Sequence, residues 1–202
     1  MYEPSEECIT DFWSNGILKN LPVSSSNPNF IKAASQLRDS CSDTNYCKKM
    51  LREDYIRLFA SRERPLAQPN ESLYSAKRDN TLSNETHSVT RFYNSYGWKS
   101  KFKDKRSDDH LGVELLFLTT LIEKYIVLDD EACSFAMREE IRRYIDQHLF
   151  TWIADWNKNM QQFAETLCYK GIGSLIYACV EDIYNLIGEN NIAMCQSNNL
   201  KN

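Results

Sequence analysis

An acid and a histidine stand at the start of the most apolar stretch of this sequence. Asp109 and His110 come directly before it, and Glu114 follows His110 by four residues, which places the last two on one face of a helix. Carboxylate and imidazole groups at this position can cap the helix, exchange protons with a substrate, or contact another molecule. Asp108 adds a further carboxylate where the helix dipole favours negative charge.

Other kinds of chemistry have little support in the sequence. His110 and Glu114 supply half of a metal site, but no Glu-x-x-His unit exists, and a carboxylate-bridged di-iron bundle needs two. The His-Glu-x-x-His pattern of zinc proteases, the glycine-rich phosphate loop and the dinucleotide fingerprint are absent as well. We therefore expect no metal site and no cofactor.

Charge and composition narrow the classes of partner. The chain has 202 residues and a formal net charge of −4, whereas proteins that bind nucleic acid usually present a basic face. Its basic cluster, residues 99–106, lies beside acids and is typical of a solvated linker. A helical regulator that contacts nucleic acid through this cluster is a weaker alternative, and we expect no nucleic-acid partner. No run of 18 apolar residues exists, so we expect no stable membrane insertion.

The seven cysteines include no Cys-x-x-Cys pair, and their number is odd. This pattern is typical of a reducing compartment and predicts a protein without a disulfide framework. We expect a cytoplasmic location.

Apolar residues recur at helical spacing throughout the chain, and no stretch alternates as a half-buried strand would. The fold class predicted is therefore all-α, a helical bundle. Proline at position 28 suits the first turn of a helix, and Asp129 or Asp130 can cap a later one. The longest irregular segment is 61–84, and long loops in compact domains tend to be functional or disordered. Helices are predicted near residues 12–18, 28–37, 46–60, 89–96, 109–127, 132–145, 149–167 and 172–186. Gly171 or Gly173 is predicted to break the chain before the last of them.

The charged stretch between two of these helices suggests a division of the chain. Residues 1–98 are predicted to form an N-terminal helical lobe and residues 109–188 a C-terminal one. Residues 99–108 are the candidate hinge between them. The polar residues 189–202 are predicted to be a disordered tail.

Four segments in this order resemble the TorD/DmsD/NarJ family of redox-enzyme maturation chaperones. The family shows a helix with Y-x-x-L-F, a loop with P-x-x-S-x-Y, a hinge motif containing D-H-[IL]-x-x-E-[LF], and an H-L-x-x-W segment. The Glu-Pro pair that precedes the family's Asp-His is replaced here by Arg106 and Ser107. The resemblance covers residues 46–187, and its matching residues are Tyr55, Leu58, Phe59, Pro69, Ser72, Tyr74, Asp109, His110, Leu111, Glu114, Leu115, His148, Leu149 and Trp152.

The resemblance implies an all-helical, cytoplasmic protein that is not an enzyme. Such chaperones bind the twin-arginine signal peptide, and often the apo form, of a molybdopterin-containing oxidoreductase subunit, and they hold back its export until the cofactor is inserted. Family members also form domain-swapped dimers, so monomer and swapped dimer both remain open. Carried over by position, the expected signal-peptide contacts are Asp109, His110, Glu114, Asp108, Ser72, Leu73 and Tyr74.

The alternative to this chaperone is a small helical enzyme that uses Asp109, His110 and Glu114 as acid–base groups. It predicts a closed pocket around these three side chains. The chaperone hypothesis predicts instead a cleft that is negative at its rim, apolar inside, and open to an extended peptide beside His110. The sequence does not name the client enzyme.

Overall fold

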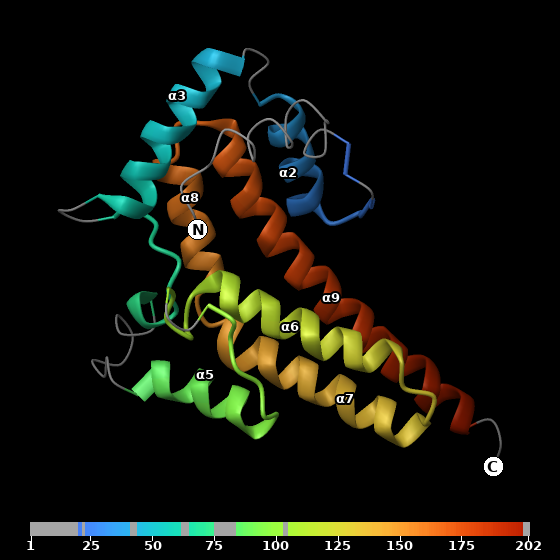
Figure 1. Cartoon of the computed structure of the whole chain (residues 1–202). Helices are drawn as coiled ribbons and strands as arrows, with labels where there is room; N and C mark the ends of the chain where they lie inside the picture. Colours follow the sequence, from blue (N-terminus) through green and yellow to red (C-terminus); the bar gives the residue numbers. More distant parts are fainter. Residues whose placement is uncertain are drawn as a thin grey trace. The chain divides into compact units, whose positions relative to one another are not determined.

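The structure is a computed structural model, and it describes residues 20–21, 23–40, 44–61, 65–74, 84–102 and 105–199. These ranges form helices joined by turns and loops, which confirms the prediction of an all-α fold (Figure 1). Within them, the extended pairing recorded is a single antiparallel bridge between Asn70 and His110. The helix predicted near residues 12–18 lies outside the described residues.

Several of the helices follow one another within a few residues. Two of them, α3 and α7, continue directly into short π-helical turns, called η1 and η2, and such turns are frequent at functional sites. The bounds are α2 Pro28–Arg38, α3 Thr44–Tyr55, η1 Ile56–Ala60, α5 Asn84–Ser95, α6 Leu111–Ile126, α7 Glu131–Tyr144, η2 Ile145–Leu149, α8 Ile153–Phe163 and α9 Leu167–Asn199.

Two helix starts follow from their capping residues. The side chain of Asn27 accepts a hydrogen bond from the backbone N–H of Asn29 at 2.9 Å, and Pro28 occupies the first helical position of α2. At the start of α7, Asp130 Oδ1 accepts from the N–H of Cys133 at 2.7 Å. Both caps agree with the sequence-based expectation, and the second selects Asp130 over Asp129.

The last helix begins earlier than its glycines suggest. Gly171 and Gly173 lie inside α9 and not before it. At each of them a neighbouring helix comes so close that a side chain would collide with it. A Cβ on Gly171 would lie 2.6 Å from Leu37 Cγ of α2, and one on Gly173 would lie 3.0 Å from Met160 Cβ of α8. The predicted start near residue 172 is therefore wrong, since these glycines serve packing rather than a chain break.

The described chain divides into two compact units. The first comprises Met1–Pro69 and Ala154–Cys179, and so contains α2, α3, η1, α8 and the beginning of α9. Its core is formed by fully buried side chains from separate elements, among them Leu37, Leu58, Trp156 and Met160. The Trp156 indole N–H donates to the carbonyl of Ala67 at 3.0 Å, which ties the loop after η1 to α8.

The second unit comprises Asn70–Ile153 and Val180–Asn202 and contains α5, α6, α7, η2 and the end of α9. Figure 1 shows α6 and α7 side by side, and residues of the two helices are in contact. Their shared interior is aromatic. Phe117 of α6 lies 5.0 Å from Tyr144 of α7 and 5.9 Å from Phe92 of α5, measured between ring centroids.

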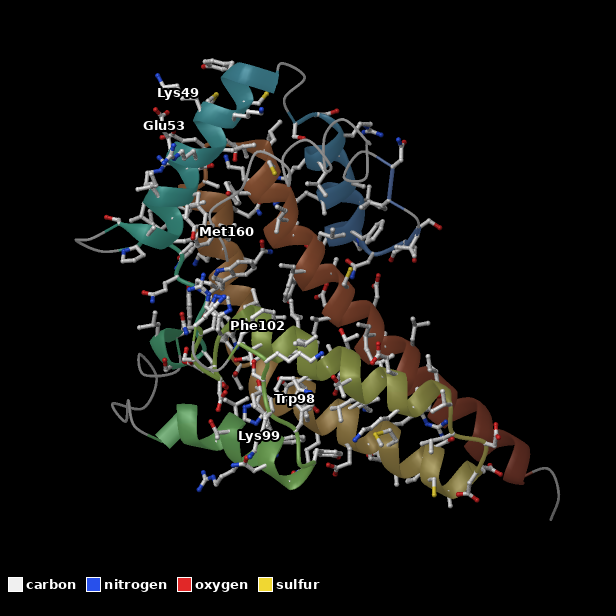
Figure 2. The ribbon with its side chains drawn as sticks, in the orientation of Figure 1. Lys49, Glu53, Trp98, Lys99, Phe102 and Met160 are labelled. Atoms are coloured by element: carbon white, nitrogen blue, oxygen red, sulfur yellow. The ribbon has the colours of Figure 1, made fainter. Side chains whose placement is uncertain are left out.

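The candidate hinge lies within this second unit. Trp98 packs against Tyr93 and Phe117 at centroid distances of 4.9 and 5.2 Å, and Figure 2 labels it together with Lys99 and Phe102 in the segment between α5 and α6. The division by contacts falls at other positions than the predicted lobe boundaries. Movement of the chain about residues 99–108 stays a prediction. The disorder predicted for residues 189–202 also stays a prediction, although α9 extends through Asn199.

Two further sequence-based expectations can be compared with the structure. Cys47 of α3 is disulfide-bonded, a bond that the prediction of a chain without a disulfide framework did not include. Among the helices in the described ranges, none combines the length and the apolar character needed to span a bilayer.

Candidate functional site

The residues that the sequence singled out meet where a short loop lies against the start of α6. The loop, residues 70–74, pairs with the residues before the helix through the bridge between Asn70 and His110. The N–H of Glu71 donates to the carbonyl of Asp109 at 3.0 Å. All of these residues belong to the second unit. The structure thus brings together two segments that are separated by about 35 residues in the sequence.

Asp109 holds the loop in place. Its side chain is only 2% exposed, and its Oδ2 accepts from the Ser72 hydroxyl at 2.6 Å and the Ser72 N–H at 3.2 Å. Its Oδ1 accepts from the Asn70 amide at 3.2 Å. Burial disfavours the charged form, but hydrogen bonds from Ser107, Ser72 and Asn70 outweigh that effect and lower the pKa of Asp109. Asp109 is therefore an ionised group that is already satisfied by the protein.

His110 caps α6. Its ring Nδ1 accepts from the N–H of Gly112 at 3.1 Å, and the side chain is half-buried. This bond requires an unprotonated Nδ1, so the neutral ring carries its proton on Nε2. Burial, together with the positive charge of Arg106, lowers the pKa of His110 to about 4. The imidazole is therefore a neutral donor at neutral pH.

We expect this cap to make stability depend on pH. The folded pKa of His110 lies below its unfolded value, so its contribution is present above pH ~6.5 and is lost as the pH falls toward 4. His110→Asn keeps a capping side chain that does not titrate. Urea denaturation at pH 7.5, 6 and 4.5 should show the wild type losing stability relative to this variant as the pH falls. A constant difference would mean that the cap does not titrate in this range.

Asp108 is tied to α5. Its Oδ2 accepts from the Thr90 hydroxyl at 2.8 Å, and its backbone carbonyl accepts from the Tyr93 hydroxyl at 3.0 Å. The side chain is half-buried, so it retains access to solvent.

Glu114 lies beneath the surface. It is fully buried, and its Oε2 accepts from the Trp152 indole N–H at 3.2 Å. Within the described part of the chain, its Oε1 has no hydrogen-bond partner. Burial, followed by the nearby charge of Glu71, raises the pKa of Glu114 well above its usual value. Burial therefore favours the protonated form of Glu114, and the side chain does not reach the surface.

Residues 72–74 alternate in exposure. Leu73 is 40% exposed, Ser72 is half-buried and engaged with Asp109, and Tyr74 is buried with its ring centroid 5.4 Å from that of Trp152. The loop therefore presents Leu73 outward from a fixed base.

This arrangement does not favour the acid–base alternative. Asp109 and Glu114 are buried and bonded within the unit, and His110 uses one ring nitrogen as a helix cap. No group of three or more potential metal ligands occurs in the residues that the structure describes. Of the expected contacts, the side chains that retain clear access to solvent are those of Leu73, which is exposed, and of His110, Asp108 and Ser72, which are half-buried.

In the part of the chain that the structure describes, pockets lie in both units, and none of the expected site residues lines the two described next. One, of about 200 Å³, lies in the first unit between α3 and the start of α9, next to Met50, Leu51 and Cys168. The other, of about 520 Å³, lies in the second unit at the corner between α6 and α7, next to Ile126, Asp129 and Arg138. The predicted cleft beside His110 stays a prediction.

Sequence reasoning missed Glu71. This residue lies between Asn70 and Ser72 in a polar loop, where an acid is ordinarily solvated, yet it is 3% exposed and lies 3.4 Å from His148 Nδ1. His148 carried a signal, because it belongs to the family-like His-Leu-x-x-Trp segment. Nothing local to Glu71 indicated that it would be buried.

Comparisons with known proteins agree on one family. The sequence model of the family described as nitrate reductase delta subunit matches residues 26–158. The chain is also similar to a protein named chaperone protein TorD from Vibrio parahaemolyticus serotype O3:K6, with 25% identity over 191 residues. That alignment covers 93% of this chain and 89% of the relative. The matched family region contains both the loop and the start of α6.

Proposed function

Because the chain belongs to the nitrate reductase delta subunit family, the TorD/DmsD/NarJ family of redox-enzyme maturation chaperones, we propose that it binds a twin-arginine leader peptide. The client would be the apo form of a molybdopterin oxidoreductase subunit, held in the cytoplasm until its cofactor is inserted. In this role the protein performs no catalysis and acts as a monomer or as a dimer swapped at residues 99–108.

The observation that carries the proposal is the outward position of Leu73 next to the capped start of α6. Leu73, His110 and Asp108 are the proposed direct contacts, with Ser72 beside them. Leu73 offers an apolar contact to the middle of the leader, and the carboxylate of Asp108 can orient an arginine. Asp109, Glu114 and Tyr74 are buried, so their proposed part is to hold these contacts in place.

The expected affinity is modest. If about four apolar side chains of the leader become buried at ~1.5–3 kcal/mol each, the gross gain is roughly 6–12 kcal/mol. Association and ordering of the peptide cost on the order of 4–15 kcal/mol. At the favourable end of both ranges the difference is about 8 kcal/mol, which corresponds to a dissociation constant of roughly micromolar and suits a chaperone that must release its client. The charged contacts then contribute orientation more than affinity.

A titration with a labelled twin-arginine leader tests this proposal. The double variant Leu73→Ser, His110→Asn removes the apolar contact and the imidazole while keeping a cap, and should bind about tenfold or more weakly. The matched control is Ile126→Ser, which changes an apolar residue of the same unit that is 68% exposed, and it should bind like the wild type. Failure of several leaders to bind the wild type would refute the function. Normal binding by the double variant would refute the site alone.

A further inference from the structure

Three buried acids lie together in the second unit, under the loop that carries Leu73. Asp109, Glu71 and Glu114 are exposed by 2%, 3% and 0%, respectively. Their partners differ. Asp109 accepts hydrogen bonds from the loop, and Glu71 lies 3.4 Å from the buried His148 ring. Glu114 accepts one hydrogen bond, from Trp152. Its other carboxylate oxygen has no partner among the described residues.

The groups that face Glu114 come from every element around it. Glu71 lies on the loop and Asp109 directly before α6, and both oppose a negative charge on Glu114. From α7, Tyr144 donates to the backbone carbonyl of Glu114 at 3.1 Å and lies 3.4 Å from the Tyr93 hydroxyl of α5. From η2, His148 is the basic side chain in contact with this cluster, and it is paired with Glu71. Among the residues that the structure describes, this cluster contains three acids and one basic side chain, His148.

From this cluster we propose that Glu114 is a proton-linked latch: neutral Glu114 allows Glu71 to stay buried and the loop 70–74 to stay closed, and loss of its proton releases the loop.

The loop is the part that should move. Glu114 is part of α6, and its side chain is bonded to Trp152, so its charge cannot leave the interior without disrupting the helix packing. Glu71 belongs to a short loop that is held by a bridge pair and by the bonds from Asn70 and Ser72 to Asp109. Releasing Glu71 to solvent breaks these bonds and its contact with His148, and it relieves the repulsion between two buried carboxylates.

The direction with pH follows from the same groups. Burial and Glu71 raise the folded pKa of Glu114 above its unfolded value of about 4.3. The stabilisation of the closed state is therefore complete at acidic pH and is lost as the pH rises through the folded pKa. Between the unfolded value and the folded pKa, the open fraction should grow by up to about tenfold per pH unit, and it should level off above the folded pKa. If the proposed function holds, the loosened Leu73 would then bind a leader more weakly, and this consequence alone rests on that function.

Amide hydrogen exchange tests the latch without any leader. The backbone N–H groups of residues 71–74 are all bonded in the closed loop, to Asp109, Asn70 or Glu71. Their exchange rates in the wild type, divided by those in Glu114→Gln at the same pH, should be near one at pH ~4 and rise about tenfold or more by pH 9. Dividing at equal pH removes the intrinsic pH dependence of exchange. Glu123→Gln, at an exposed position of the same helix, should match the wild type throughout.

Two results would overturn the latch. A ratio that stays flat with pH would show that Glu114 does not control the loop. An equal rise in the exchange ratio of the backbone amides of α6 and α7 would show general destabilisation instead of local opening of the loop. If Glu114→Gln fails to fold, Glu71→Gln tests the same repulsion from the other side, and it too should flatten the pH dependence. If neither the wild type nor any variant binds a leader, but the exchange ratio still rises with pH, the result would count against the proposed function and leave the latch standing.

Discussion

Replacing Asp109 with alanine should cost about 2–4 kcal/mol of unfolding free energy and should also weaken leader binding. The carboxylate is buried and accepts three hydrogen bonds from Asn70 and Ser72, and bonds to a charged acceptor contribute about 1.5–3 kcal/mol each before the donors relax toward solvent. Without the carboxylate, the loop loses its anchor and Leu73 loses its defined position. Urea denaturation followed by tryptophan fluorescence, combined with a leader titration, measures both effects.

The neighbouring acid provides the matched control. Asp108→Ala removes a half-buried carboxylate that accepts one bond, from Thr90, and it should cost no more than about 1 kcal/mol. Asp109→Asn keeps an acceptor and should fall between the two. Its deficit against the wild type should shrink below pH ~4, because the lowered folded pKa makes the contribution of Asp109 disappear as the pH falls through it. Equal costs for Asp108→Ala and Asp109→Ala would contradict the anchoring role of Asp109.

The second large effect is expected at Asp54, in the first unit. This side chain is 1% exposed and accepts from the N–H of Thr166 at 2.8 Å and its hydroxyl at 2.7 Å, from the N–H of Glu165, and from Arg57 at 2.6 Å. It therefore satisfies the donors at the start of α9 from the end of α3. Asp54→Ala leaves these groups without their acceptor and should cost about 3–5 kcal/mol, measurable as a lower urea midpoint.

Glu53 is the control for this prediction. It precedes Asp54 on α3 but is exposed, and its ion pair with Lys49, at 3.9 Å, lies on the helix surface (Figure 2). Glu53→Ala should cost no more than about 0.5 kcal/mol, because an exposed pair of this spacing contributes little. A loss at Asp54 as small as that at Glu53 would mean that α9 begins without help from α3.

The hydrophobic pattern was sufficient for the fold class and for most helix positions. Each helix repeats its apolar residues along the chain, and several mark their own ends, as Pro28 and Asp130 do. These are local signals, encoded by residues within a few positions of one another. Gly171 and Gly173 were misread for the opposite reason. Their role depends on Leu37 and Met160, which are distant or not adjacent in the sequence.

For the site, the sequence by itself determined that Asp109 and His110 stand at the start of an apolar helix with Glu114 one turn on. The tertiary structure alone decided what each does. Asp109 is an anchor because a loop 37 residues earlier supplies its donors, and the neutral form of Glu114 is favoured because its side chain is buried next to Glu71. Burial and charge state depend on which distant segments pack together, and spacing along the chain does not contain that information.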